Sequence, residues 1–345
     1  MARPEPPWTG AATGVGSLPH HDPHAATRFV FDTLAELPHL PELPARGPGA
    51  DTVGRTAAVL SGLYVDRQPS GWRFVARPGV DHRRAVDFLA RDLDALEEHA
   101  ADYAGPLKLQ LAGPWTLAAG VELTRGDRAL ADRGAVRDVA AALVEAVRAH
   151  AADVQRRVPR AQLVVQLDEP ALPAVLAGAV PTASGFGALA PVDAADAQSA
   201  LAEVLASAAE TGPAGVHCCA AQPPIALLRD AGARFVSVDL ALVEPAADDE
   251  LGECVAAGIA LWLGLVPTSG RAAELGSAAH LAEPARALWD RLGFPPDELT
   301  RGVVVTPACG LAAATEEYAV AALKRTVEIA RVLAEAPERS SVSRR

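Results

Sequence analysis

Short apolar runs alternate with longer amphipathic stretches along most of this 345-residue chain. Eight of the runs have the length and apolar content expected of buried strands. The predicted strands cover residues 14–18, 40–45, 107–111, 163–167, 215–219, 235–240, 260–266 and 303–306. The run at 40–45 gives the weakest signal of the eight.

Between these runs, apolar positions recur every three or four residues, which is typical of helices that pack by one face. The predicted helices cover residues 23–37, 81–103, 128–157, 193–211, 224–231, 246–257, 271–292 and 311–334. Alternating strands and helices are typical of βα units around a parallel sheet. Eight such units favour an α/β fold closed into a (β/α)8 TIM barrel, and a doubly wound open sheet is the alternative.

One segment interrupts the alternation. Residues 52–78 contain two strand-like pieces on either side of Pro69-Ser70-Gly71, which predicts a β-hairpin inserted at the top of the barrel. No internal repeat or linker is visible in the sequence. We therefore expect a single domain over residues 1–337 and a disordered tail at 338–345.

The charge balance narrows the choice of partners. The chain has 31 Lys and Arg against 43 Asp and Glu, a net charge of −12, which argues against binding to a nucleic-acid backbone. It has no apolar run of about 18 residues, the length that a membrane helix needs, and its N-terminus lacks the apolar core of a signal peptide. We therefore expect a cytoplasmic protein without a nucleic-acid or membrane partner, whose cysteines stay reduced.

Candidate metal ligands follow several of the predicted strands, whose carboxyl ends meet at one mouth of a barrel. His217 and Cys219 are two positions apart, so their side chains point to the same side, whereas Cys218 points to the other. Asp239 ends the next strand, and Cys309 follows the last one. This set of nitrogen, sulfur and carboxylate ligands suits zinc. The alternative is that the cysteines are simply buried in the core, where cysteine is common.

Two further polar features are predicted at the same mouth. Asp168 and Glu169 follow a buried strand, and they indicate either a site for a substrate ammonium group or a solvated pair at the start of a loop. Ser17 lies at the end of the first predicted strand, where a serine is by itself an ordinary turn residue.

Four motifs together resemble the cobalamin-independent methionine synthases. They are GVGSLP at 14–19, QLDEPAL at 166–172, HCC at 217–219 and TPACGL at 306–311. In order and spacing they are similar to the catalytic carboxyl-terminal barrel of that family, which some bacteria and archaea carry as a free-standing protein. The resemblance covers nearly the whole chain, and it implies a (β/α)8 barrel that uses zinc to transfer a methyl group to the thiol of homocysteine.

The resemblance also implies roles for single residues. The zinc ligands would be His217, Cys219, Asp239 and Cys309, and the amino-acid part of homocysteine would be held by Ser17 and Asp168. It assigns no residue to proton transfer, so the catalytic residues stay unknown.

The sequence departs from the family pattern at four places. Asp239 stands where the family typically has a glutamate ligand. Arg46 lies near the place of a glutamate that helps to hold the substrate amine, and an arginine there would favour a carboxylate. Gly120 replaces a tryptophan of the folate site, and residues 264–270 lack the histidine proposed as proton donor.

We therefore expect a zinc-dependent methyltransferase that acts on a small thiol, with homocysteine as the first candidate and methionine as its product. The methyl donor would be 5-methyltetrahydrofolate or a methyl-corrinoid protein. One alternative is a methylcobalamin:thiol methyltransferase of the uroporphyrinogen decarboxylase-like type with another, acidic thiol acceptor. The other is a degenerate, non-catalytic barrel that binds zinc or a thiol.

Overall fold

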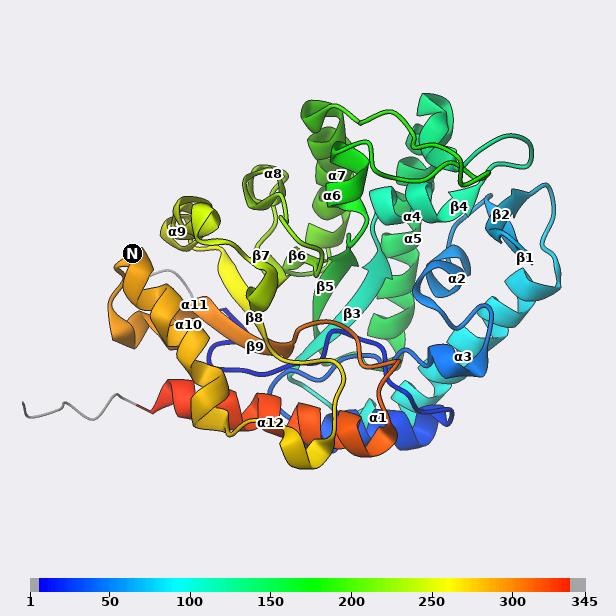
Figure 1. Ribbon diagram of the computed structural model, residues 1–345. Helices are drawn as coiled ribbons and strands as arrows, with labels where there is room; N and C mark the ends of the chain where they lie inside the picture. Colours follow the sequence, from blue (N-terminus) through cyan, green and yellow to red (C-terminus); the bar gives the residue numbers. More distant parts are fainter. Residues whose placement is uncertain (1–5, 336–345) are drawn as a thin grey trace, which may run out of the picture.

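The computed structural model describes residues 6–335, so the predicted tail at 338–345 lies outside the described residues. Its centre is a curved sheet of parallel strands in the order β3-β5-β6-β7-β8-β9 (Figure 1). These strands are β3 (Pro106–Ala112), β5 (Gln162–Asp168), β6 (Ala214–Cys218), β7 (Phe235–Asp239), β8 (Ala260–Val266) and β9 (Val303–Pro307). They match the last six predicted strands to within a residue or two.

Two extended segments, residues 11–18 and 38–43, close the sheet into a barrel, and we call them the seam segments. Single parallel bridges join them to each other and to the strands on either side. The bridges pair Ala12 with Val305 of β9, Ser17 with Glu42, and His39 with Lys108 of β3. Backbone hydrogen bonds run in both directions at each joint, so the eight-stranded order is complete although two members are irregular.

The irregularity of the seam has a cause in the sequence. Pro38, Pro41 and Pro44 recur at every third position, and proline has no N–H to donate to a ladder. In the other seam segment, a Cβ on Gly14 would collide with the His39 ring, so glycine permits this close approach. The strands predicted at 14–18 and 40–45 are therefore extended segments with isolated bridges instead of regular strands.

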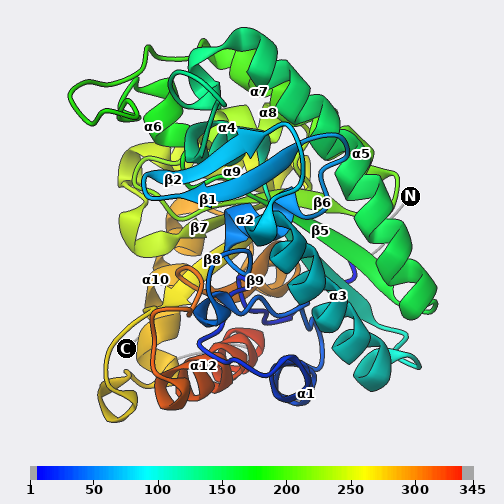
Figure 2. The same cartoon turned by 90° about the vertical axis from the view of Figure 1, so that its right-hand side faces the viewer.

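Helices surround the sheet (Figures 1 and 2). They are α1 (Pro23–Thr33), α2 (Thr52–Ala57), α3 (Val80–Ala100), α4 (Pro114–Gly120), α5 (Arg133–Arg157), α6 (Leu172–Leu176), α7 (Ala194–Ala209), α8 (Ile225–Asp230), α9 (Asp248–Ala257), α10 (Ala278–Leu292), α11 (Leu299–Gly302) and α12 (Glu316–Ala334). Short 3-10 turns are η1 (Pro44–Arg46), η2 (Ala129–Ala131), η3 (Leu240–Leu242), η4 (Pro245–Ala247), η5 (Ala272–Glu274) and η6 (Pro296–Glu298). Among the described residues, no helix is both long and apolar enough to cross a membrane.

The predicted hairpin is present at the edge of the barrel. It consists of β1 (Tyr64–Gln68) and β2 (Gly71–Val75), which pair antiparallel, and a short parallel strand, β4 (Val121–Glu122), extends it. Figure 2 shows the hairpin beside α2, toward the viewer.

The inside of the barrel divides into an apolar floor and a polar upper half. At the floor, Phe235 and Trp262 stack with ring centroids 3.7 Å apart, and Trp8 packs edge-on against both. A Cβ on Gly215 would collide with Phe235, so glycine makes room for this stack. Above the floor, inward positions of β3, β5, β6 and β7 carry buried polar side chains, among them Lys108. A closed floor below polar groups places the chemistry at the carboxyl ends of the strands.

Candidate functional site

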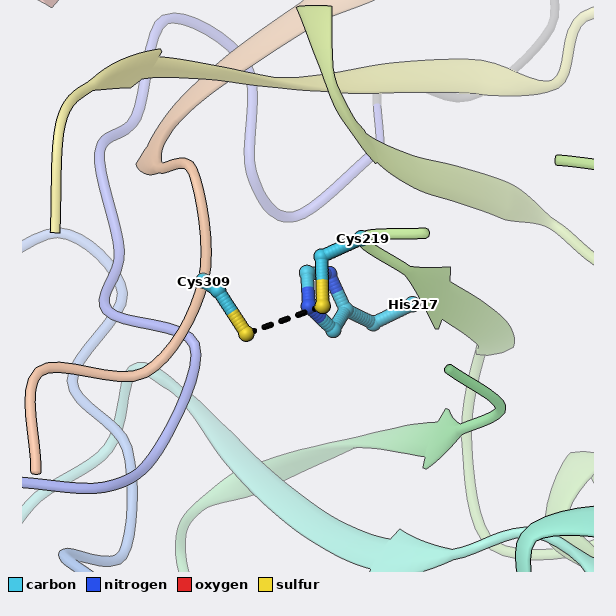
Figure 3. Close-up of side chains that lie close together, drawn as sticks. All are labelled: His217, Cys219 and Cys309. Atoms are coloured by element: carbon cyan, nitrogen blue, oxygen red, sulfur yellow. Dashed lines mark hydrogen bonds between the residues drawn. The ribbon is translucent and has the colours of Figure 1, made fainter. Parts of the chain in front are cut away.

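A histidine and two cysteines meet at the mouth of the barrel (Figure 3). His217 lies on β6, Cys219 directly follows that strand, and Cys309 lies in the loop after β9. The two sulfurs are 2.9 Å apart, and the candidate ligand atoms of all three residues lie within 4.8 Å of one another. A Cβ on Gly264 would collide with the backbone of Ala308, so a glycine on β8 lets the Cys309 loop come this close.

The His217 ring is oriented by a single neighbour. Its Nδ1 lies 2.9 Å from the Ser237 hydroxyl, which projects from the inward face of β7. Its Nε2 is buried and has no hydrogen-bond partner among the described residues, although it faces the two sulfurs. A buried nitrogen without a partner beside two thiols is the arrangement that a metal ion would complete. The residues therefore fit zinc, which prefers imidazole and thiolate ligands.

The two thiols perturb each other's pKa. The hydrogen bond from Cys219, aided by the nearby His217 ring, lowers the pKa of Cys309 to about 4. The same hydrogen bond, together with burial, raises the pKa of Cys219. The shared hydrogen bond thus favours a thiolate at Cys309 and a thiol at Cys219. Cys218 differs: it packs in the hydrophobic core, and burial raises its pKa to about 12.

Asp239 lies close to this group but outside it. It ends β7, and its Oδ1 accepts a 3.0 Å hydrogen bond from the backbone N–H of Ala241, which lies within the turn η3. Burial raises its pKa and the charge of Cys309 adds to this shift, whereas the hydrogen bond from Ala241 and the charge of His217 oppose it. Its carboxylate is not among the three residues whose ligand atoms cluster. Its role as fourth ligand stays a prediction.

Ser17 lies against the Cys309 loop. The backbone N–H of Leu311 donates to the Ser17 carbonyl at 2.8 Å, and a Cβ on Gly310 would collide with the Ser17 hydroxyl. Glycine at 310 therefore lets the first seam segment pack beside the loop that carries Cys309. Ser17 is half-buried, at the mouth where the resemblance predicts it.

The two carboxylates predicted as a pair have separate roles. Glu169 accepts hydrogen bonds from the backbone N–H groups of Trp115 and Thr116 and from the Thr116 hydroxyl, so it caps the N-terminus of α4. Asp168 points into the barrel beside His217, with only 8% of its surface exposed. Burial raises the pKa of Asp168 to about 7, although the nearby charge of His217 opposes the shift. Of these two carboxylates, only Asp168 faces the interior of the barrel, where a ligand would bind.

A glutamate that the sequence analysis missed lies opposite Asp168. Glu42 is buried in the second seam segment, where its backbone pairs with that of Ser17. Burial raises the pKa of Glu42, and the nearby charges of Arg55 and Lys108 lower it. The charge of Glu42 in turn raises the pKa of Asp168. The sequence does contain a signal for this residue, because Glu42 is a charged residue inside the otherwise apolar run Leu40-Pro41-Glu42-Leu43.

Arg46, which the sequence analysis placed near a position that holds the substrate amine, is paired with a carboxylate of the protein. Two of its guanidinium nitrogens each lie 2.8 Å from an oxygen of Asp92 on α3, and its side chain is only 9% exposed. Asp92 also accepts a hydrogen bond from Arg55. Arg46 is thus neutralised between the seam and α3, and it gives no reason to favour an acidic substrate.

A groove of about 500 Å3 lies beside Gly120, the position where the family pattern has a tryptophan. It lies between the loop after the second seam segment and the hairpin. Its polar and aromatic lining includes Asp51, Arg67 and Trp72. The Trp72 indole donates to Asp51 at 2.9 Å, so the hairpin brings an aromatic ring next to Gly120.

Comparisons with known proteins agree with this geometry. A family described as the catalytic domain of the cobalamin-independent synthases matches residues 11–332. A solved structure of a B12-independent methionine synthase from Shewanella sp. W3-18-1, in complex with selenomethionine, is 13% identical, with a TM-score of 0.60 over 94% of this chain and 97% of that one.

A second structure, GH5_18 from Streptomyces cattleya in complex with GlcNAc, is 17% identical, with a TM-score of 0.45 over 95% of this chain and 81% of that one. No protein with a curated function matches this sequence.

Proposed function

This chain belongs to the family of cobalamin-independent synthase catalytic domains, and from that premise we propose that it is a zinc-dependent methyltransferase that converts homocysteine into methionine. The family is one of methionine synthases, and the barrel architecture is that of the Shewanella enzyme. Zinc, the acceptor and the methyl donor are the parts of the proposal that need experiments.

The observation that carries the proposal is the buried, unpartnered Nε2 of His217 beside the sulfurs of Cys219 and Cys309. These three side chains would hold the zinc, with Asp239 as the candidate for the fourth position. When bound, zinc would supply a Lewis acid that keeps the substrate sulfur deprotonated and nucleophilic. Ser237 would keep the His217 ring in the orientation that this requires.

Homocysteine is favoured as acceptor by the charges around the site. Asp168 and Glu42 are two buried carboxyl groups that would attract a substrate ammonium, and Ser17 offers its hydroxyl to the substrate carboxylate. With Arg46 paired to Asp92, no described observation favours an acidic thiol over homocysteine. The selenomethionine bound to the Shewanella enzyme is an analogue of the product that we propose.

The methyl donor would enter through the groove beside Gly120. Trp72 and Arg67 give it an aromatic ring and a cation, which would suit the pterin ring and the glutamate carboxylates of 5-methyltetrahydrofolate. A methyl-corrinoid protein is the second candidate donor, and both are to be tested with the same enzyme preparation.

The test compares two neighbouring cysteines. We expect Cys219→Ala to lose stoichiometric zinc and methyl transfer from either donor, because it removes one ligand. Cys218→Ala is the matched control, since that thiol packs in the core, and it should keep zinc and activity. Zinc is measured by elemental analysis, and methionine formation by mass spectrometry.

Full zinc content and full activity in Cys219→Ala would overturn the proposed metal centre. If the unmodified protein binds zinc and homocysteine but neither donor yields methionine, the non-catalytic binding barrel is the better description. If another thiol is methylated faster than homocysteine, the acceptor is wrong and the zinc chemistry stands.

A further inference from the structure

A lysine without any assigned role lies at the centre of the barrel. Lys108 is on β3 with 0% of its surface exposed, one layer below the mouth. Its Nζ donates to the Val15 carbonyl at 2.7 Å, to Gln166 Oε1 at 3.0 Å and to Gln110 Oε1 at 3.4 Å. An ammonium has three N–H donors, so Lys108 is saturated, and no carboxylate is bonded to it directly.

The contact with Gln166 fixes how that amide is oriented. Because Gln166 Oε1 accepts from Lys108, its Nε2 faces the other way, where it donates to Asp168 Oδ1 at 2.7 Å and to the Val15 carbonyl at 3.0 Å. Reversing the amide would bring its NH2 group against the lysine ammonium and its oxygen against the carboxylate. Lys108 therefore ensures that Gln166 presents a donor to Asp168, and it leaves the second oxygen of Asp168 free.

The same arrangement occurs on the opposite side. Gln110 also turns its Oε1 toward Lys108, and its Nε2 donates to the Leu40 carbonyl. One cation thus orients two glutamines, and one of them, Gln166, donates to a carboxylate at the mouth.

We propose that Lys108 is a positioning residue that, through Gln166, holds Asp168 in the orientation that receives the ammonium group of the substrate. The inference rests on the proposed function, because it takes an amino-acid thiol as the ligand. It adds a residue that never touches the substrate but decides how this anionic partner of the substrate is oriented.

The charges around Lys108 agree with this role. Two carboxylates buried side by side repel each other, and a cation between them reduces the cost of keeping both ionised. Asp168 and Glu42 raise the pKa of Lys108, whereas burial lowers it more, to about 8. Arg55 lies 3.8 Å from Glu42 and supplies the remaining positive charge on that side.

The experiment measures binding of two ligands to the zinc-loaded protein by calorimetry. One ligand is homocysteine, and the other is 4-mercaptobutyrate, which has the same thiol and carboxylate but no ammonium. For Lys108→Met we expect the Kd of homocysteine to rise about 10- to 100-fold, the scale of a lost charge-assisted hydrogen bond. We expect the Kd of 4-mercaptobutyrate to change by less than about threefold and the zinc content to stay the same.

If Lys108 has only a structural role, Lys108→Met should bind both ligands more weakly by the same factor, and that result would overturn the inference. An unchanged affinity of Lys108→Met for homocysteine would also overturn it. Gln166→Met is the second variant, because it removes the donor to Asp168 and keeps the lysine. It should reproduce the selective loss, and it decides the question if Lys108→Met does not fold. Thr326→Val, a buried hydroxyl change on α12, is the control and should leave both affinities unchanged.

Failure of the inference is distinguishable from failure of the proposed function. If the unmodified zinc-loaded protein does not bind homocysteine, the proposed acceptor is wrong. If the unmodified protein binds homocysteine and both variants bind it equally well, only the role of Lys108 is wrong.

Discussion

The site contains two pairs of adjacent, chemically similar residues, and in each pair the two side chains have different roles. Cys219 points to the barrel mouth and Cys218 into the core. Asp168 faces the interior, whereas Glu169 caps α4. In both pairs the alternation of side chains along and just beyond a strand separates a residue that can bind a ligand from one that supports the wall.

Replacing Ser237 tests whether zinc binding depends on the orientation of the His217 ring as well as on the presence of the ring. We predict that Ser237→Ala lowers zinc affinity about 10- to 100-fold, because His217 then loses the hydrogen bond that fixes its ring and tautomer. The measurement is competition with a chromogenic chelator, alongside the thermal midpoint. Ser207→Ala, a buried serine on α7 that contacts only a helix carbonyl, is the control. Unchanged zinc affinity in Ser237→Ala would show that the ring is oriented by its packing alone.

Successive side chains of a strand point to opposite sides, so the placement of His217 and Cys219 on the same side was predictable from the sequence. The partner of His217 was not, because Ser237 reaches it only through the register of β6 against β7. The pairing of Arg46 was not predictable for a similar reason. Its partner, Asp92, lies on a helix whose packing against the seam no local pattern specifies.

Among the elements, α5 carries a feature that should make the fold sensitive to acid. His150 is only 4% exposed, and its Nε2 has no hydrogen-bond partner among the described residues. Burial, and then the nearby charge of Arg55, lower its pKa to about 3 from the ordinary value of 6.5. Between these two pH values the unfolded chain binds a proton that the folded chain does not, so stability falls as the pH drops through this window.

We therefore predict that His150→Leu makes the metal-free protein less sensitive to acid. At pH 4.5 the variant should retain about 2–3 kcal/mol of unfolding free energy that the parent loses between pH 7 and that pH. Urea titrations at both pH values give the comparison. His280→Leu, at an exposed histidine on α10, is the matched control and should track the parent. If the parent and His150→Leu lose the same amount of unfolding free energy between pH 7 and pH 4.5, then protonation of His150 does not destabilise the folded state.

Most elements follow from hydrophobic periodicity, and the exceptions are where other constraints dominate. The eight predicted helices and the six central strands are present, because these segments bury continuous apolar faces. Three of the helices, α5, α10 and α12, start five to seven residues later than predicted, and the short helices α2, α4, α6 and α11 were not predicted. The two seam segments gave weaker patterns. Prolines there lack the backbone N–H that a regular strand would donate, and glycines let neighbouring side chains approach the backbone closely. The positions of these residues depend on which parts of the chain pack beside them, and no local pattern shows this.

At the scale of the whole molecule, the closed barrel depends on its least regular part. β3 and β5 are seven residues long and pair over their whole length, whereas each joint of the seam has a single bridge. Ser17 and Glu42, two residues that we propose to contact the substrate, are paired with each other in this seam. The substrate would therefore bind across the weakest closure of the barrel, to groups held by few backbone hydrogen bonds.

This arrangement predicts a local response to the ligand. In the metal-free protein, amide hydrogens of residues 11–18 and 38–43 should exchange faster than those of β5, because fewer hydrogen bonds must open. Zinc and homocysteine together should slow exchange in both seam segments, since the ligand joins them to each other and to the Cys309 loop, and a stabilised closed state exchanges less. Hydrogen–deuterium exchange with mass spectrometry resolves these peptides, and peptides of α5 provide the internal control. If the seam exchanges as slowly as β5 without ligand, or if zinc and homocysteine leave its rate unchanged, then the closure is rigid and the substrate does not bridge it.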